Sequence, residues 1–305
     1  DPVLLDGDKA EVFHRMVMQL LYLCQRGRPD LRTAISFLCR RTTAPDEDDY
    51  KKLKRVMQYL QADIDLKLVL SADGSGVIQW WVDAVYGVHF DMKTHTGGTL
   101  SMGKGSVYSF SGAQKLVSRS STEAELIGVD DLMPQMMWTG YFLKAQGVAV
   151  VDTVLYQDNK STMLLEKNGR ASSGKRTRHI DIRFYFVADR VKNGELRIEH
   201  CPTEDMVADY FTKPLQGILF YKLRDQVMNI DSSSSYHSSQ RSVLTGEDLE
   251  QTNPDIDLKE QQVTQPSVVR RRSYRDVVVA TSSNIGEHHP ASGSADHPAT
   301  GCAEL

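Results

Sequence analysis

Apolar residues recur every three or four positions over the first 70 residues, a period that predicts helices with one buried face. The pattern fits three helices: one over about 10–26, one opening at Pro29 and one over about 46–61. Acidic residues at 47–49 lie at the start of the third helix, where they complement the backbone dipole. We therefore expect a small helical segment over 1–72, with no evident chemistry of its own.

From about residue 75 the pattern changes to alternating apolar and polar positions, interleaved with helical stretches. Three strands are expected first, over 77–83, 99–102 and 106–110, and then a long helix from about Ser121. After it we expect a strand over 154–158, a helix over 181–192, a strand over 196–200 and a last helix opened by Thr203. A three-strand meander followed by alternating helices and strands is typical of an α/β fold built on a mixed sheet.

The end of the chain has a different composition. From residue 231 it is polar and rich in Ser, and it closes in His, Pro, Ala and Gly. Such a segment buries too little apolar surface to offset its ordering entropy, so we expect a disordered tail. The predicted domains are therefore 1–72, 73–230 and 231–305.

The overall composition narrows the class of protein. The chain has 305 residues, of which 40% are hydrophobic and 25% charged, as in ordinary globular proteins. No run approaches the roughly 18 apolar residues of a membrane span, so no membrane partner is expected. A net charge of −4 excludes a wholly basic nucleic-acid binder, although a local basic patch is compatible with it. The start at Asp1, without an initiator Met or a signal-like segment, leads us to expect a fragment or a processed piece.

Four acidic residues fall where carboxylates are useful in an α/β fold. Asp83 lies on the first long strand and Asp158 ends the central strand, and ligands tend to bind in the crevice beyond strand ends. Glu125 lies in the first turns of the long helix, and Asp209 in the middle of the last one. Clustered carboxylates are readily neutralised by divalent cations, and two such ions about 4 Å apart can activate water for attack on a phosphodiester.

Each acid also has a plainer interpretation. Asp158 could cap the helix that follows it, and Asp209 could be an exposed helix acid. Glu123 lies three residues after Ser120, which is the spacing of a capping box. Glu125 instead shares a helical stripe with apolar residues at offsets of four, seven and eleven, so we prefer it to Glu123 as the candidate. Spacing alone does not show that the four acids converge.

Five short motifs occur in order along the chain. They read SSTEAEL at 120–126, QDN at 157–159, KRTRHIDIR at 175–183, PTED at 202–205 and ADYFTKPL at 208–215. Together they resemble the signature motifs of copia-type LTR retrotransposon Pol polyproteins, and the resemblance covers roughly 9–230. It implies a ribonuclease H-like α/β domain over 73–230, a mixed sheet flanked by helices. It also implies that 1–72 is a remnant of the reverse transcriptase thumb or connection.

The resemblance implies an activity, cofactors and site residues. It implies a metal-dependent endonuclease that cleaves the RNA strand of RNA–DNA hybrids with two Mg²⁺ ions, for which Mn²⁺ could substitute. Its catalytic and metal-binding acids would be Asp83, Glu125, Asp158 and Asp209. His200 lies where some ribonucleases H have a mobile His that assists product release. Phosphate contacts would come from a basic patch of five residues: Lys175, Arg176, Arg178, His179 and Arg183.

The resemblance also implies partners and a location. The partners would be the hybrid itself and the polymerase portion of the same polyprotein, whose Tyr-x-Asp-Asp motif this chain lacks. The location would be cytoplasmic virus-like particles or the nucleus. One departure is that Ala84 and Val85 follow Asp83, where the family often has a second acid. Two alternatives stay open: a catalytically silent relic acting as a structural or interaction module, and an integrase, which would normally bring a His/Cys zinc module.

Overall fold

The structure is a computed structural model, and it describes residues 2–168 and 181–230. Outside the described residues lie the predicted tail 231–305 and four members of the predicted basic patch, namely Lys175, Arg176, Arg178 and His179. Within the described part, no helix is long and apolar enough to cross a membrane.

Three helices come first, as the sequence predicts. They are α1 (Gly7–Arg26), α2 (Arg32–Cys39) and α3 (Glu47–Ala62), with a short 3-10 helix, η1 (Pro29–Leu31), before α2. Their apolar stripes pack together into a buried cluster that includes Phe13, Ile35 and Leu53. At the start of α3, the side chains of Asp46 and Asp49 each accept a hydrogen bond from the other's backbone N–H, which satisfies two otherwise unpaired donors.

The main sheet has five strands in the order β5-β3-β2-β6-β7. Their bounds are β2 (Val77–Val85), β3 (His95–Ser101), β5 (Tyr108–Ala113), β6 (Asp152–Gln157) and β7 (Arg197–His200). β2, β3 and β5 form an antiparallel meander, whereas β6 and β7 run parallel to β2. The predicted mixed sheet is confirmed. A separate two-stranded ribbon pairs β1 (Ser71–Ala72) with β4 (Gly103–Lys104).

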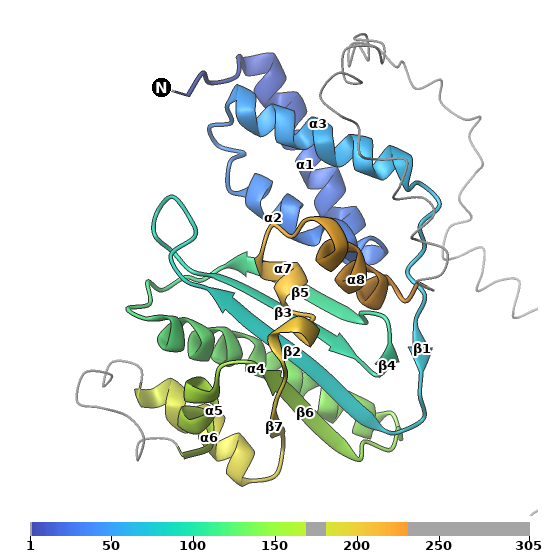
Figure 1. The fold of residues 1–305 in the computed structure, drawn as a ribbon, viewed down its shortest axis with the longest axis vertical. Coiled ribbons are helices and arrows are strands. Elements are labelled where there is room, and N and C mark those ends of the chain that lie inside the picture. Colours follow the sequence, from blue (N-terminus) through green and yellow to red (C-terminus); the bar gives the residue numbers. More distant parts are fainter. Residues whose placement is uncertain (1, 169–180, 231–305) are drawn as a thin grey trace, which may run out of the picture. The chain divides into compact units, whose positions relative to one another are not determined.

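Helices flank this sheet (Figure 1). On one face α4 (Ser121–Ala145) packs against β2 and β3, with α5 (Lys160–Asn168) and α6 (Asp181–Lys192) beside it. On the other face α7 (Asp209–Thr212) packs against β3, and α8 (Gly217–Met228) packs against α7. The core between α4 and the sheet contains Trp80, Leu126 and Met133, all completely buried.

Two neighbouring glycines of β3 let α4 and α7 approach from opposite faces. A Cβ on Gly98 would lie 2.4 Å from the Leu132 side chain of α4. A Cβ on Gly97 would lie 2.8 Å from the backbone carbonyl carbon of Phe211 in α7. β3 includes both glycines, whereas the sequence pattern predicts that this strand starts after them, at Thr99.

The last elements differ from those predicted. The prediction of one helix that starts at Thr203 and has Asp209 in its middle is wrong. The structure has a 3-10 helix, η4 (Thr203–Asp205), followed by α7, which begins at Asp209. The helix is interrupted because Met206 has an extended backbone. α7 is short because Pro214 holds the preceding Lys213 in an extended conformation. The following helix, α8, is not predicted by the sequence pattern.

Candidate active site

Three of the four candidate acids converge at one end of the sheet. Asp83 lies on β2, Glu125 in the first turns of α4 and Asp158 directly after β6. Each offers a carboxylate oxygen, and these three oxygens all lie within 4.8 Å of one another. β2 and β6 are parallel neighbours, so residues near their carboxyl ends meet at the same edge. Three of the four expected site acids therefore meet at this edge, and we call these three side chains the acidic cluster.

The structure separates the two neighbouring glutamates of α4. The Glu123 side chain accepts a hydrogen bond from the backbone N–H of Arg119 at 2.6 Å, and Ser120 Oγ accepts one from the backbone N–H of Glu123 at 3.2 Å. Glu123 therefore belongs to the cap of α4. Glu125 points into the acidic cluster, and its Oε2 is buried with no hydrogen-bond partner among the described residues.

The capping role considered for Asp158 is taken by its neighbour. Asn159 Oδ1 accepts hydrogen bonds from the backbone N–H groups of Ser161 at 3.0 Å and Thr162 at 3.2 Å, at the start of α5. This arrangement satisfies the helix start without Asp158. The half-buried Asp158 carboxylate is thus left to the acidic cluster.

Asp209 adjoins the acidic cluster through residues of its own turn. Lys213 Nζ lies 2.6 Å from Asp209 Oδ1 and 3.7 Å from Asp83 Oδ2, so the ammonium group bridges the two acids. Thr212 donates a hydrogen bond from Oγ1 to Asp83 Oδ2 at 2.6 Å. Thr212 and Lys213 are not among the site residues expected from the sequence. Their offsets of three and four from Asp209, on the same helical face, are the signal that could have identified them.

The electrostatics of the acidic cluster disfavour full ionisation. Burial, with the charges of Asp83 and Asp158, raises the pKa of Glu125 to about 9. Burial and the charge of Asp83 also raise the pKa of Asp158. The same two causes raise the pKa of Asp209 to about 6, although Lys213 opposes them. Because the carboxylates repel one another in a poorly solvated place, a cation among them would be strongly stabilising.

The donor set fits a divalent metal ion. Mg²⁺ and Mn²⁺ prefer oxygen ligands, and the acidic cluster offers three convergent carboxylates. The unpartnered, buried Oε2 of Glu125 is an oxygen that such an ion would satisfy. Asp83, Glu125 and Asp158 are therefore the residues that could hold it.

Two further candidates have clear positions. Arg183, the described member of the predicted basic patch, forms ion pairs with Asp130 at 2.6 Å and Asp131 at 3.2 Å on α4. His200 ends β7 and is exposed. Its partner on β6 is Gln157, the residue before Asp158, so His200 lies beside the acidic cluster.

Comparison with curated proteins finds transposon polyproteins. The chain is 32% identical over 195 residues, 63% of its length, to the retrovirus-related Pol polyprotein from transposon RE2 of Arabidopsis thaliana. It is 30% identical over 202 residues to the corresponding RE1 polyprotein of the same plant, and 28% identical over 209 residues to that of transposon TNT 1-94 of Nicotiana tabacum. These matches span only 13%, 14% and 16% of the respective relatives. No protein-family model matches the chain.

Two solved structures are similar to the chain. One is LC11-RNase H1, isolated from compost, with 13% identity and a TM-score of 0.34 over 45% of this chain and 92% of that one. The other is the N-terminal RNase H domain of a Mycobacterium tuberculosis protein, with 10% identity and a TM-score of 0.31 over 54% of this chain and 97% of that one. The expected mixed sheet flanked by helices is observed.

Proposed function

We propose that this chain, which is similar to part of the retrovirus-related Pol polyproteins of plant transposons, is a copia-type ribonuclease H that cleaves the RNA strand of RNA–DNA hybrids. The observation that carries the proposal is the acidic cluster, assembled from two strand ends and one helix start. The helical segment 1–72 would be the remnant of the thumb or connection, which in the longer polyprotein would meet the polymerase portion.

The chemistry proposed for this site depends on divalent cations. Asp83, Glu125 and Asp158 would hold one Mg²⁺ ion, and Asp83 with Asp209 would hold the second ion that the family resemblance implies; Mn²⁺ could substitute. Such ions supply an activated water molecule and neutralise the charge that develops on the phosphodiester and its departing 3′ oxygen.

The chain's own residues prepare this site. Thr212 fixes the orientation of the Asp83 carboxylate by donating to Oδ2. Lys213 holds Asp209 next to Asp83 and neutralises part of their charge. Without a cation, Glu125 holds a proton at neutral pH, because its pKa is about 9. Metal binding would therefore release a proton and would be favoured as the pH rises.

Substrate binding and product release stay predictions. Phosphate contacts are expected from the basic patch, Lys175, Arg176, Arg178, His179 and Arg183, although Arg183 is already paired with acids of α4. The position of His200 beside Asp158 is compatible with the expected role in product release. Cytoplasmic virus-like particles or the nucleus remain the expected location.

The test is cleavage of an end-labelled RNA–DNA hybrid by the full chain, with Mg²⁺ or with a chelator. We expect Mg²⁺-dependent cutting of the RNA strand by the wild type. The Asp158→Asn variant, which keeps the size of the side chain, should lose at least about 100-fold in rate. Equal inertness of wild type and variant would instead support the silent relic, in which the fold persists as an interaction module.

A further inference from the structure

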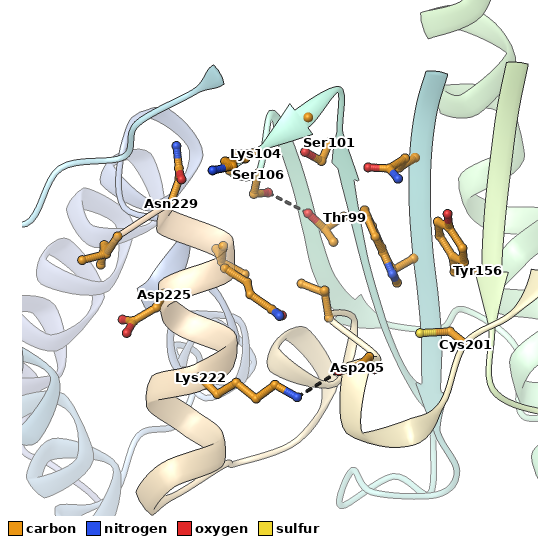
Figure 2. Close-up of a pocket in the computed structure, with 18 of the residues that line it drawn as sticks. Thr99, Ser101, Lys104, Ser106, Tyr156, Cys201, Asp205, Lys222, Asp225 and Asn229 are labelled. Carbon is orange, nitrogen blue, oxygen red and sulfur yellow. Dashed lines mark hydrogen bonds and ion pairs between the residues drawn. The ribbon is translucent and has the colours of Figure 1, made fainter. Parts of the chain in front are cut away.

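A pocket of about 760 Å³ lies between the main sheet and α8 (Figure 2). This volume is in the range of small-ligand sites. Trp81 of β2 and Tyr156 of β6 line it, and each lies two residues before an acid of the cluster, Asp83 and Asp158. Residues two apart on a strand share a face and are about 6.7 Å apart, so the pocket and the acidic cluster follow each other along the same strands.

Trp81 is half-buried, and part of its side chain lines this pocket. Its cross-strand neighbours are Tyr156 on one side and Thr99 on the other. Tyr156 stacks on the indole, with ring centroids 5.0 Å apart and planes 21° apart. Thr99 also lines the pocket, but its side chain is too small to cover an indole ring. Trp81 also packs on the small buried cluster of Cys201, Met206 and Ala208, and the part of its ring that lines the pocket beside Thr99 is the surface on which a planar ligand would stack.

The pocket also has a hydrogen-bonding group that lacks a partner. Ser101 lies on the same strand face as Thr99, is only 7% exposed and lines the pocket. Its hydroxyl has no hydrogen-bond partner among the described residues, which is uncommon for a buried polar atom. Figure 2 shows Ser101 and Thr99 on the sheet wall, with Asn229 and Lys222 on the α8 side. A ligand with polar ring atoms would satisfy the Ser101 hydroxyl.

Both acids of the pocket lining are paired with cations, so the lining is compatible with an anionic chain. The two acids are neutralised locally: Asp205 pairs with Lys222 at 2.9 Å, and Asp225 pairs with Arg224 at 3.1 Å. Lys104 adds a positive charge, and His200 adds ring nitrogens that can form hydrogen bonds, at exposed positions of the lining. An aromatic ring combined with cations is the composition of single-strand binding sites on proteins.

We propose that this pocket takes a nucleobase of an unpaired nucleic-acid strand, stacked on Trp81 and hydrogen-bonded to Ser101, next to the acidic cluster. The inference rests on the proposed function and deepens it, because it gives the nuclease a single-strand subsite beside the cutting position. It predicts that binding depends on the base itself and not only on the phosphate backbone.

The experiment measures binding of the full chain to a labelled single-stranded DNA by fluorescence anisotropy in Mg²⁺ buffer. A second oligonucleotide has the same length and charge but abasic central positions. We expect the wild type to bind the complete strand about tenfold more tightly than the abasic one, the effect of one stacked base. Trp81→Leu and Ser101→Phe, which remove the ring and fill the pocket, should abolish the preference.

Two variants control for folding and for general aromatic contacts. Trp81→Phe keeps an aromatic face and should retain part of the preference. Trp138→Leu makes the leucine change at a tryptophan of α4 that is 56% exposed and does not line the pocket, and should retain all of it. Equal affinity of the wild type for both oligonucleotides, or an equal loss in Trp138→Leu, would overturn the proposal. The proposal would also be overturned if a nucleoside monophosphate displaced the labelled DNA as effectively as unlabelled strand does. The pocket would then take free nucleotides and not a base of a strand.

Hybrid cleavage, measured in parallel, separates the two claims. DNA binding does not require catalysis, so a base preference without any RNA cleavage would defeat the nuclease and leave the nucleobase pocket. RNA cleavage without a base preference would support the nuclease and defeat the nucleobase pocket.

Discussion

Glu166 is the most isolated acid among the described residues. It lies on α5, its side chain is completely buried, and neither carboxylate oxygen has a hydrogen-bond partner in the described part of the chain. Burial raises its pKa from 4.5 to about 8. Its charge also acts on Glu125, so ionisation of Glu166 would disfavour the charged state of the acidic cluster. A group of this kind makes the stability of the fold depend on pH.

We predict that Glu166→Gln stabilises the protein at pH 8 but not at pH 4.5. The folded protein holds the Glu166 proton more tightly than the unfolded chain, so this contribution to stability is complete below pH 4.5 and is lost as the pH rises to about 8. Glutamine has no such proton to lose. Melting temperatures measured with a chelator should rise by roughly 4 °C or more at pH 8.

The control for this prediction is Glu11→Gln, at an exposed position of α1. It should leave the melting temperature unchanged at both pH values. The prediction is contradicted if the difference in melting temperature between Glu166→Gln and the wild type is the same at every pH from 4.5 to 8. Glu166 would then not titrate in the way that its burial implies.

Some residues of the site can be predicted individually from the sequence. The apolar stripe of α4 selects Glu125 over Glu123, and the capping-box spacing accounts for Glu123. Asp158 could not be separated from a helix cap, because Asn159 follows it and either residue type can cap. Only the hydrogen bonds of Asn159 decide the matter.

At the scale of elements, the site depends on how closely α7 sits on the sheet. α7 carries Asp209 and Thr212, and Thr212 reaches Asp83 across the contact with β3. Gly97 is the β3 residue directly opposite Asp83, and it meets the backbone of α7. The absence of a side chain there sets the distance between the two elements.

We predict that Gly97→Ala disturbs both stability and the site. Its Cβ would lie 2.8 Å from a backbone atom, so α7 must shift, and overpacking of this kind costs about 1–3 kcal/mol. The free energy of unfolding in urea should fall by that amount, and hybrid cleavage should fall with it. The matched change Gly140→Ala, in α4 with nothing within 4 Å of the new atom, should leave cleavage intact. Wild-type stability in Gly97→Ala would contradict the close approach.

The helices could be predicted from the sequence, but the full extent of β3 could not. The helices of 1–72 and the long helix follow from strong apolar periodicity and clear caps. Two consecutive glycines look like a strand boundary, yet Gly97 and Gly98 lie inside β3 because α7 and α4 pack on its two faces. That reason is tertiary and has no local signal.

At the scale of the molecule, a buried polar network ties the helical segment to α7, which packs on the sheet. Asp30 pairs with Arg28 at 2.8 Å, and both side chains are almost fully buried. The Tyr59 hydroxyl donates to Asp30 Oδ2 at 3.0 Å. The Tyr210 hydroxyl, from α7, donates to the backbone carbonyl of Asp30 at 3.0 Å. Such contacts, far apart in sequence, could not be inferred from local patterns.

We predict that Asp30→Asn destabilises the helical segment and the sheet together. The change leaves the buried Arg28 charge uncompensated, which costs roughly 3–5 kcal/mol. Urea unfolding should show one transition at lower urea, by circular dichroism and by tryptophan fluorescence alike. Asp48→Asn, which removes an exposed ion pair with Lys52, should change almost nothing. Two separate transitions would mean that the parts fold independently.

The central claim is that the acidic cluster cleaves RNA in a hybrid, and a pair of neighbouring glutamates tests it most directly. The measurement is the initial rate of Mg²⁺-dependent cleavage by Glu125→Gln and Glu123→Gln, with folding verified by circular dichroism. Glu125→Gln should lose at least about 100-fold, because it removes an oxygen of the cluster. Glu123→Gln should cleave at close to the wild-type rate, because that side chain caps a helix. Equal rates in Glu125→Gln and the wild type, or a loss confined to Glu123→Gln, would contradict the account.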